Sequence, residues 1–239
     1  MLKITDLMVS VQETKVLGGV TLSFEKGKNY CVLGKNGSGK SSLAMTVMWH
    51  PSYEIADWDI SLDHKSILDM EPDERSQAGI FLAFQSIPEI KGVKLFEFLR
   101  TIYNTRREKK ESFVSFKRLI LPYLEELGIE KDFLRRDLNV WFSGGERRKI
   151  EILQLKLLDP TYIILDEVDS GLDVDAFRSV AGLLKALNTA DNSIIIITHY
   201  FTILEYIPVD EVYVLESGKV VDQWGLEIAQ RIQKDWFGK

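Results

Sequence analysis

The sequence predicts an α/β fold with a mixed, mainly parallel core sheet, an antiparallel β region at the N-terminus and a helical insert. Residues 79–85, 161–167 and 192–199 are continuous apolar runs, typical of strands buried on both faces of a parallel sheet. The first 30 residues instead alternate apolar and polar positions, as the strands of a half-exposed sheet do. Residues 95–140 have helical spacing and few β signals, which places the helical insert there.

The N-terminal region is expected to contain three strands and a helix. The stretches "ITDLMVSV" (4–11) and "VTLSF" (20–24) alternate and predict antiparallel strands. The run "KNYCVLG" (28–34) is more continuously apolar and predicts a buried strand, which leads into the helix predicted for "SSLAMTVMWH" (41–50).

Three further segments complete the outline. The stretch "VDEVYVLESGKVVDQW" (209–224) alternates again, with Ser217-Gly218 as a hairpin turn signal. The charge run "RREKKE" (106–111) is interpreted as a solvated helix end or loop, with a partner-docking surface as the alternative. The amphipathic tail "LEIAQRIQKDWFGK" (226–239) is expected to pack on the body as a helix, or else to serve as a partner or membrane-surface helix.

The composition is that of a soluble globular protein. Hydrophobic residues occupy 45% of the 239 positions, and no uninterrupted apolar run of about 18 residues encodes a membrane span. No secretory signal core is present, and the single cysteine excludes an internal disulfide and a cysteine-built metal site. We therefore expect a reducing, cytoplasmic setting in which Cys31 is a small buried hydrophobe. The net charge of −6 argues against nucleic acid as a partner.

A phosphate-binding loop is encoded between the predicted strand 28–34 and its helix. The stretch "LGKNGSGKSS" fits the pattern G-x-x-x-x-G-K-[ST], in which backbone N–H groups curl around an anion at a helix N-terminus. We expect Lys40 to bridge the β- and γ-phosphates, Ser41 to contact Mg²⁺ and Ser42 to contact the α-phosphate. The residues predicted to hold the nucleotide are Gly34, Lys35, Asn36, Gly37, Ser38, Gly39, Lys40, Ser41 and Ser42.

Two adjacent carboxylates end another predicted strand, in "YIILDEVDSGLD" (162–173). Charge at an apolar strand tip is costly unless ions or hydrogen bonds compensate it. We expect Asp166 to hold Mg²⁺ through its water shell. Glu167 is expected to polarise the water that attacks the γ-phosphate, a role that typically contributes about 10²–10⁴-fold in rate. A solvated acidic turn is the alternative.

Gln85 and His199 end the predicted strands 79–85 and 192–199. The carboxyl ends of parallel strands face the ligand crevice in open α/β sheets, so both side chains are expected at the site. Gln85 is expected to reach Mg²⁺ or the attacking water, and His199 the γ-phosphate. For His199 a purely structural role is the alternative.

In this order the motifs resemble those of the ATP-binding cassette (ABC) ATPases, from Leu2 to about Trp224. The resemblance implies hydrolysis of ATP with Mg²⁺ by a single cassette domain over residues 1–239. A RecA-like core with the antiparallel β subdomain would occupy approximately 1–85 and 159–239. A helical subdomain would occupy approximately 86–158.

The stretch "FSGGE" (142–146) matches the signature of that family. Because two cassettes of the family pair head to tail, the resemblance implies that Ser143, Gly144 and Gly145 face the γ-phosphate bound by the other subunit. This is chemically reasonable, since Ser143 can cap the following helix, whose N-terminus favours anions, and glycine permits close approach. A capping turn with no partner role is the alternative.

Two other stretches bear on the resemblance to the family. "SGLD" (170–173) looks like the loop that crosses the interface between the two cassettes, with Asp173 near the opposed phosphate loop. Many cassettes stack an aromatic residue of the first sheet on adenine, but "VSVQETKVL" (9–17) contains none. Val11 or Val16 is the candidate for apolar contact there.

The spellings "SGGERRKIEILQL", "DEVDSGLD" and "THYFTILEYI" resemble the SufC-type ATPases of the SUF iron–sulfur cluster assembly machinery. The resemblance implies a β-helical scaffold partner of the SufB/SufD kind, strained by a transient ATP-dependent homodimer, with no direct membrane insertion. One alternative is the nucleotide-binding subunit of an ABC membrane transporter. A nucleic-acid or ribosome-associated cassette is the other, although 239 residues leave no room for tandem cassettes or long coiled-coil inserts.

Overall fold

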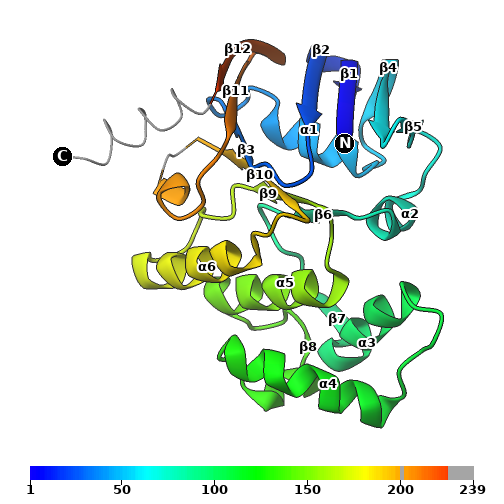
Figure 1. Ribbon diagram of the computed structural model, residues 1–239, viewed down its shortest axis with the longest axis vertical. Helices are drawn as coiled ribbons and strands as arrows, with labels where there is room; N and C mark the ends of the chain where they lie inside the picture. Colours follow the sequence, from blue (N-terminus) through cyan, green and yellow to red (C-terminus); the bar gives the residue numbers. More distant parts are fainter. Residues whose placement is uncertain (200–201, 226–239) are drawn as a thin grey trace. The chain divides into compact units, whose positions relative to one another are not determined.

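The computed structural model describes residues 1–199 and 202–225, so the predicted tail helix lies outside the described residues. The chain forms two compact units (Figure 1). The first contains Met1–Gln85, Pro160–Val168 and the described residues between Asn188 and Gly225, and the second contains Ser86–Asp159 and Asp169–Leu187.

A six-stranded sheet forms the centre of the first unit, in the order β12-β11-β3-β10-β9-β6. The strands from β11 to β6 are parallel neighbours, and β12 pairs antiparallel with β11. The predicted parallel core sheet and the hairpin at Ser217-Gly218 are therefore confirmed, and Cys31 is buried in β3 as expected. The strands are β3 (Tyr30–Leu33), β6 (Ile80–Ala83), β9 (Tyr162–Asp166), β10 (Ser193–Thr198), β11 (Glu211–Glu216) and β12 (Lys219–Gly225).

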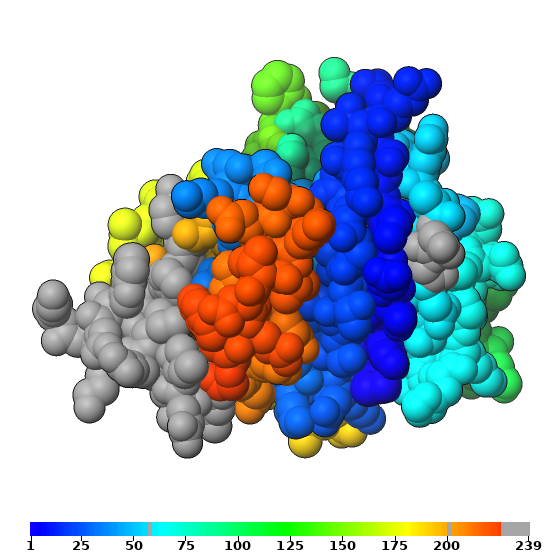
Figure 2. Space-filling model, turned by 90° about the horizontal axis from the view of Figure 1, so that it is seen from above, coloured from blue at the N-terminus to red at the C-terminus, as the bar shows by residue number. Residues whose placement is uncertain are grey.

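A four-stranded antiparallel sheet, in the order β2-β1-β4-β5, completes the β structure of this unit. It confirms the antiparallel region predicted for the first 30 residues, and it extends that region to strands that the sequence did not predict. The strands are β1 (Leu2–Val11), β2 (Thr14–Phe24), β4 (Glu54–Leu62) and β5 (Lys65–Ser66). Strands β2 and β12 contact each other, and Figure 2 shows β1 and β2 in blue beside β11 and β12 in orange.

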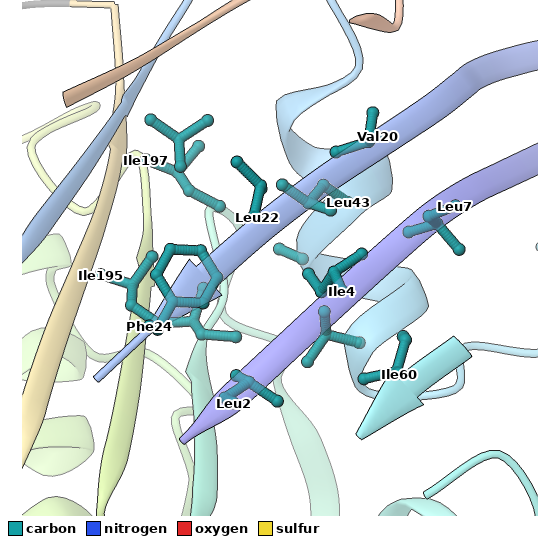
Figure 3. Packing of buried hydrophobic residues seen from close by; sticks show 14 of the residues in the cluster. Leu2, Ile4, Leu7, Val20, Leu22, Phe24, Leu43, Ile60, Ile195 and Ile197 are labelled. Carbon is teal, nitrogen blue, oxygen red and sulfur yellow. The ribbon is translucent and has the colours of Figure 1, made fainter. Parts of the chain in front are cut away.

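One hydrophobic core holds the two sheets around helix α1 (Lys40–Val47). Leu43 of this helix, Ile4 and Leu22 of the antiparallel sheet, and Ile195 of β10 are all at most 3% exposed. Figure 3 shows these side chains pointing toward one another. Helix α1 is thus fixed by apolar packing at the point where the phosphate loop enters it. A short helix, α2 (Pro72–Gln77), precedes β6.

The second unit is mainly helical, as predicted for the insert. Helix α5 contacts both α3 and α6 (Figure 1). Its helices are α3 (Leu95–Thr105), α4 (Phe113–Glu126), α5 (Gly144–Leu158) and α6 (Val174–Leu187), with a 3-10 turn η1 (Lys131–Arg135) and a small ladder of β7 (Ile90–Lys94) and β8 (Asp137–Leu138). Among the described residues, no helix combines the length and the apolar character that crossing a membrane requires.

The charge run 106–111 joins α3 to α4 as a loop, and most of it is exposed as expected. Arg106 differs from that expectation, because its guanidinium donates a 2.5 Å hydrogen bond to the carbonyl oxygen of Leu158. Burial lowers the pKa of Arg106 from its ordinary value. This residue therefore closes the C-terminal end of α5, while residues 107–110 are exposed.

Candidate active site

The phosphate loop lies between β3 and α1 and is packed too closely for side chains at two glycines. A Cβ atom on Gly34 would overlap the carbonyl oxygen of Leu215 and the hydroxyl of Ser38. Gly39 has a φ of 102°, and a Cβ there would come within 2.7 Å of Leu17 and 2.9 Å of the carbonyl oxygen of Val16. These contacts explain why the loop requires glycine where it enters the helix.

Lys40 is the first residue of α1 and is 4% exposed. Its ammonium donates to the carbonyl oxygens of Gly34 at 2.8 Å and Lys35 at 3.1 Å, so the side chain folds back across its own loop. A buried cation at a helix N-terminus, next to a glycine-rich loop, favours a bound phosphate.

Ser41 and Asp166 meet beside the loop. The Ser41 hydroxyl donates to Asp166 Oδ1 at 3.1 Å, and Asp166 is fully buried at the end of β9. A hydroxyl and one carboxylate are oxygen ligands that suit Mg²⁺, which usually keeps several waters and takes the remaining ligands from substrate phosphates. The donor set therefore fits Mg²⁺, although no group of three His, Cys, Asp or Glu side chains among the described residues could hold a metal alone.

Glu167 directly follows β9 and is the residue on which the other polar side chains converge. Gln85 Nε2 donates to Glu167 Oε2 at 2.6 Å, and His199 Nδ1 lies 3.2 Å from Glu167 Oε1. The carboxylate also lies 3.6 Å from the ammonium of Lys40. The backbone of Glu167 is left-handed, with a φ of 45°, and its N–H donates to the carbonyl oxygen of Ile197. Such a conformation is strained for a non-glycine residue and is found preferentially at functional sites.

A cavity of about 900 Å³ adjoins the phosphate loop. Residues 34–38 and His199 line it, together with the turn between β11 and β12 and Trp224. Trp224 was not predicted at this site, and its only signal in the sequence is an aromatic residue at the end of the alternating run 209–224.

The signature segment lies in the second unit and begins α5. Ser143 is the N-cap: its hydroxyl accepts from Glu146 N–H at 3.3 Å, and the Glu146 carboxylate accepts from Ser143 N–H at 2.6 Å. A Cβ on Gly145 would lie 3.2 Å from Ala176 Cβ, and one on Gly144 would lie 3.4 Å from Leu172. Packing within this unit thus also favours glycine at both positions, because the small residues let α5 begin in close contact with residues 171–176.

Asp173 has a capping contact of the same kind, because its carboxylate accepts from Ala176 N–H at 2.8 Å at the start of α6.

The structure groups the predicted site residues in two sets. Lys40, Ser41, Gln85, Asp166, Glu167 and His199 meet in the first unit. The signature residues Ser143, Gly144 and Gly145, with Asp173, belong to the second unit.

Parallel strands that end at a phosphate loop, with a carboxylate pair beside the loop lysine, define the class of P-loop nucleotide hydrolases. Residues 17–170 match the ABC transporter family. The chain belongs to this family of ATP-binding cassettes: it is an ATPase, and it uses ATP with Mg²⁺.

Proteins of similar sequence match along almost the whole chain. "Probable ATP-dependent transporter ycf16" of Pyropia yezoensis is 45% identical, over 99% of this chain and 97% of its own. "Vegetative protein 296" of Bacillus subtilis is 42% identical, over 99% of this chain and 91% of its own. "ABC transporter I family member 6, chloroplastic" of Arabidopsis thaliana is 39% identical, over 99% of this chain and 72% of its own.

Solved structures show the same fold. The ATP-binding cassette MJ0796, described as dimeric in a post-hydrolysis state bound to ADP and Pi, superposes with a TM-score of 0.80. The match covers 95% of this chain and 99% of that one at 20% sequence identity, which carries an argument about the fold alone. The predicted cassette fold is confirmed.

Proposed function

We propose that two copies of this chain pair head to tail around ATP, and that ATP hydrolysis drives a conformational change in a β-helical scaffold of the SufB/SufD kind during cytoplasmic iron–sulfur cluster assembly. The local spellings of α5 and of residues 166–173 support the SufC-type assignment. We also propose that the two regions around residues 1–85 with 159–239, and 86–158, act as the core and helical subdomains of one cassette. The compact units differ from this division in one segment, because Asp169–Leu187 belongs to the second unit.

The observation that carries the pairing is the exposed start of α5. Ser143 and Gly144 are exposed, and Ser143 caps a 15-residue helix whose N-terminus favours anions. Such a surface suits a γ-phosphate presented by another copy. The dimeric state described for the structurally similar cassette with ADP and Pi is consistent with this arrangement.

The residues of the first unit then have defined roles. Backbone N–H groups of residues 34–39 hold the phosphates, Lys40 neutralises the β- and γ-phosphates, and Ser42 contacts the α-phosphate. Ser41, Asp166 and Gln85 would hold Mg²⁺, which when bound withdraws charge from the phosphates. Glu167 accepts a proton from the attacking water, and His199 both orients that carboxylate and reaches the γ-phosphate.

Pairing couples this chemistry to the scaffold. A ligand shifts a conformational equilibrium only by its different affinity for the two states, and ATP contacted by both copies has that preference. About 5.5 kcal/mol of preference would take the pair from 1:99 to 99:1. Hydrolysis removes the preference, so each cycle closes and reopens the pair.

The alternative is the nucleotide-binding subunit of a membrane transporter. It is favoured by the names of the relatives from Pyropia yezoensis and Arabidopsis thaliana, which describe transporters. Purification with native partners separates the two functions: a β-helical scaffold supports our proposal, whereas an integral membrane protein supports the alternative. The purified complex should assemble clusters with ATP, and the same complex with Lys40→Ala should not. Equal cluster assembly by both complexes would contradict the coupling.

A further inference from the structure

Trp141 is the most exposed of the large hydrophobic side chains that the structure describes, with 87% of its surface accessible. Its neighbours Val140 and Phe142 are buried, at 8% and 3% exposure, and the ring of Phe142 packs against Phe133 at 4.7 Å between centroids. The segment is therefore anchored on both sides of Trp141, while the indole is presented outward, two residues before Ser143.

The backbone adds a second observation. Trp141 has a φ of 62°, in the left-handed region that is unfavourable for a bulky residue. Folding alone favours glycine at such a position, and an exposed ring contributes little to the core. Trp141 is strained and faces outward beside Ser143. These features are typical of a residue that binds a ligand and not of one that packs in a core.

The phosphate site supplies no aromatic ring from the segment where one was expected. Leu17 and the carbonyl oxygen of Val16 lie next to Gly39, and residues 9–17 contain no aromatic residue. A nucleobase bound beyond this loop would meet aliphatic or main-chain atoms from these residues. Trp224 also lines the cavity beside the loop, and it would cover at most one face of the base, which leaves the other face for a ring of another copy.

We propose that Trp141 of one copy stacks on the nucleobase of the nucleotide held by the other copy. This inference rests on the proposed head-to-tail pairing. Two residues of extended chain span at most about 7 Å, and the indole reaches further. When Ser143 meets the γ-phosphate, the ring can therefore lie over the nucleoside end of the same nucleotide. Stacking on an aromatic side chain accepts any base, so it would favour pairing with nucleotide bound rather than discriminate strictly among bases.

The test uses the full chain carrying Glu167→Gln, with Trp141→Gly and Trp141→Phe added separately. Glycine removes the ring and tolerates the positive φ, so the melting temperature should not fall. Affinity of the monomer for ATP should stay within about two-fold of the parent. The dissociation constant of the ATP-bound pair, measured by sedimentation, should rise about ten-fold or more for Trp141→Gly and much less for Trp141→Phe.

A fluorescent adenine analogue, 1,N6-ethenoadenosine triphosphate, distinguishes contact with the base from contact with protein. Its emission should be quenched when the parent pairs, and the quenching should be lost in Trp141→Gly measured at concentrations where the variant is paired.

Unchanged pairing, or quenching that persists without Trp141, would overturn the inference. Trp224→Ala is the matched control, since Trp224 lines the cavity beside the phosphate loop, and loss of quenching in this variant alone would also overturn it. If the parent fails to pair with ATP, the proposed function itself fails.

Discussion

The carboxylate of Glu167 lies 3.6 Å from the ammonium of Lys40, and these side chains are only 8% and 3% exposed. Lys40 is the cation that we place on the β- and γ-phosphates. A phosphate group at that position would bring its negative charge against the carboxylate, and like charges in a buried site repel. ATP binding is therefore expected to turn Glu167 away from Lys40 and toward the attacking water.

Glu167→Gln should bind ATP at least as tightly as the parent, because the carboxylate no longer competes for Lys40. Turnover should fall about 10²–10⁴-fold, since the amide cannot accept the proton. ATP should then accumulate a stable dimer. Calorimetry, phosphate release and sizing measure the three effects, with the exposed Glu125→Gln on α4 as the control. A variant that stays monomeric with saturating ATP would count against the pairing.

Lys40→Ala should weaken ATP binding about ten-fold or more, because a charge-assisted hydrogen bond to phosphate is lost from a buried position. The matched control is Lys26→Ala, which removes a lysine from an exposed ion pair with Asp191. That change should leave nucleotide affinity unaltered. Equal ATP affinity of Lys40→Ala and the parent, measured by calorimetry, would contradict the assignment of the phosphate loop.

The parallel core sheet could be predicted because its strands are buried on both faces and read as continuous apolar runs. Strand β4 was missed for a physical reason. In its pairing with β1, Met8 lies opposite Asp57 and Val9 opposite Ile55, so an extra residue of β4 is inserted in the ladder. A bulge of this kind interrupts the two-residue alternation from which a strand is recognised.

The candidate site was predictable only to the level of which strands end near one another. The motifs placed Lys40, Glu167 and Gln85 at one edge of the sheet, but sequence does not fix side-chain rotamers. It therefore did not indicate that Gln85 donates to Glu167, or that Glu167 approaches Lys40. Trp224 was missed because the hairpin at Ser217-Gly218, although predicted, does not indicate which side chains of the returning strand line the cavity beside the loop.

Arg75 is fully buried and links α1 to the segment before α2. Burial lowers its pKa to about 10, so it remains charged at neutral pH. Its guanidinium donates to the carbonyl oxygens of Met70, Thr46, Val47, Ile67 and Leu68. Arg75→Met should lower the free energy of unfolding by about 3 kcal/mol or more, because buried carbonyl groups lose their donors. Urea unfolding measures this loss.

The control for Arg75 is Arg118→Met, which changes an exposed arginine of α4 and should alter stability by no more than about 0.5 kcal/mol. The free energy of unfolding of Arg75→Lys should lie between those of Arg75→Met and Arg118→Met. An ammonium has three N–H donors and cannot reproduce the five donors of the planar guanidinium. If Arg75→Met were as stable as the parent, the guanidinium would not be the tie between α1 and the following segment.

Ser143 and Glu146 form a reciprocal cap at the start of α5, and this pairing lets helix stability be separated from a role in the dimer. Ser143→Ala and Glu146→Ala each remove one half of the cap, so each should lower the free energy of unfolding by about 1 kcal/mol. Only Ser143→Ala also removes the hydroxyl that we propose faces the γ-phosphate of the other copy. In a Glu167→Gln background it should therefore abolish most ATP-dependent pairing, whereas Glu146→Ala should pair nearly as well as the parent. Sedimentation with saturating ATP compares them, and equal pairing by the two variants would leave Ser143 with its capping role alone.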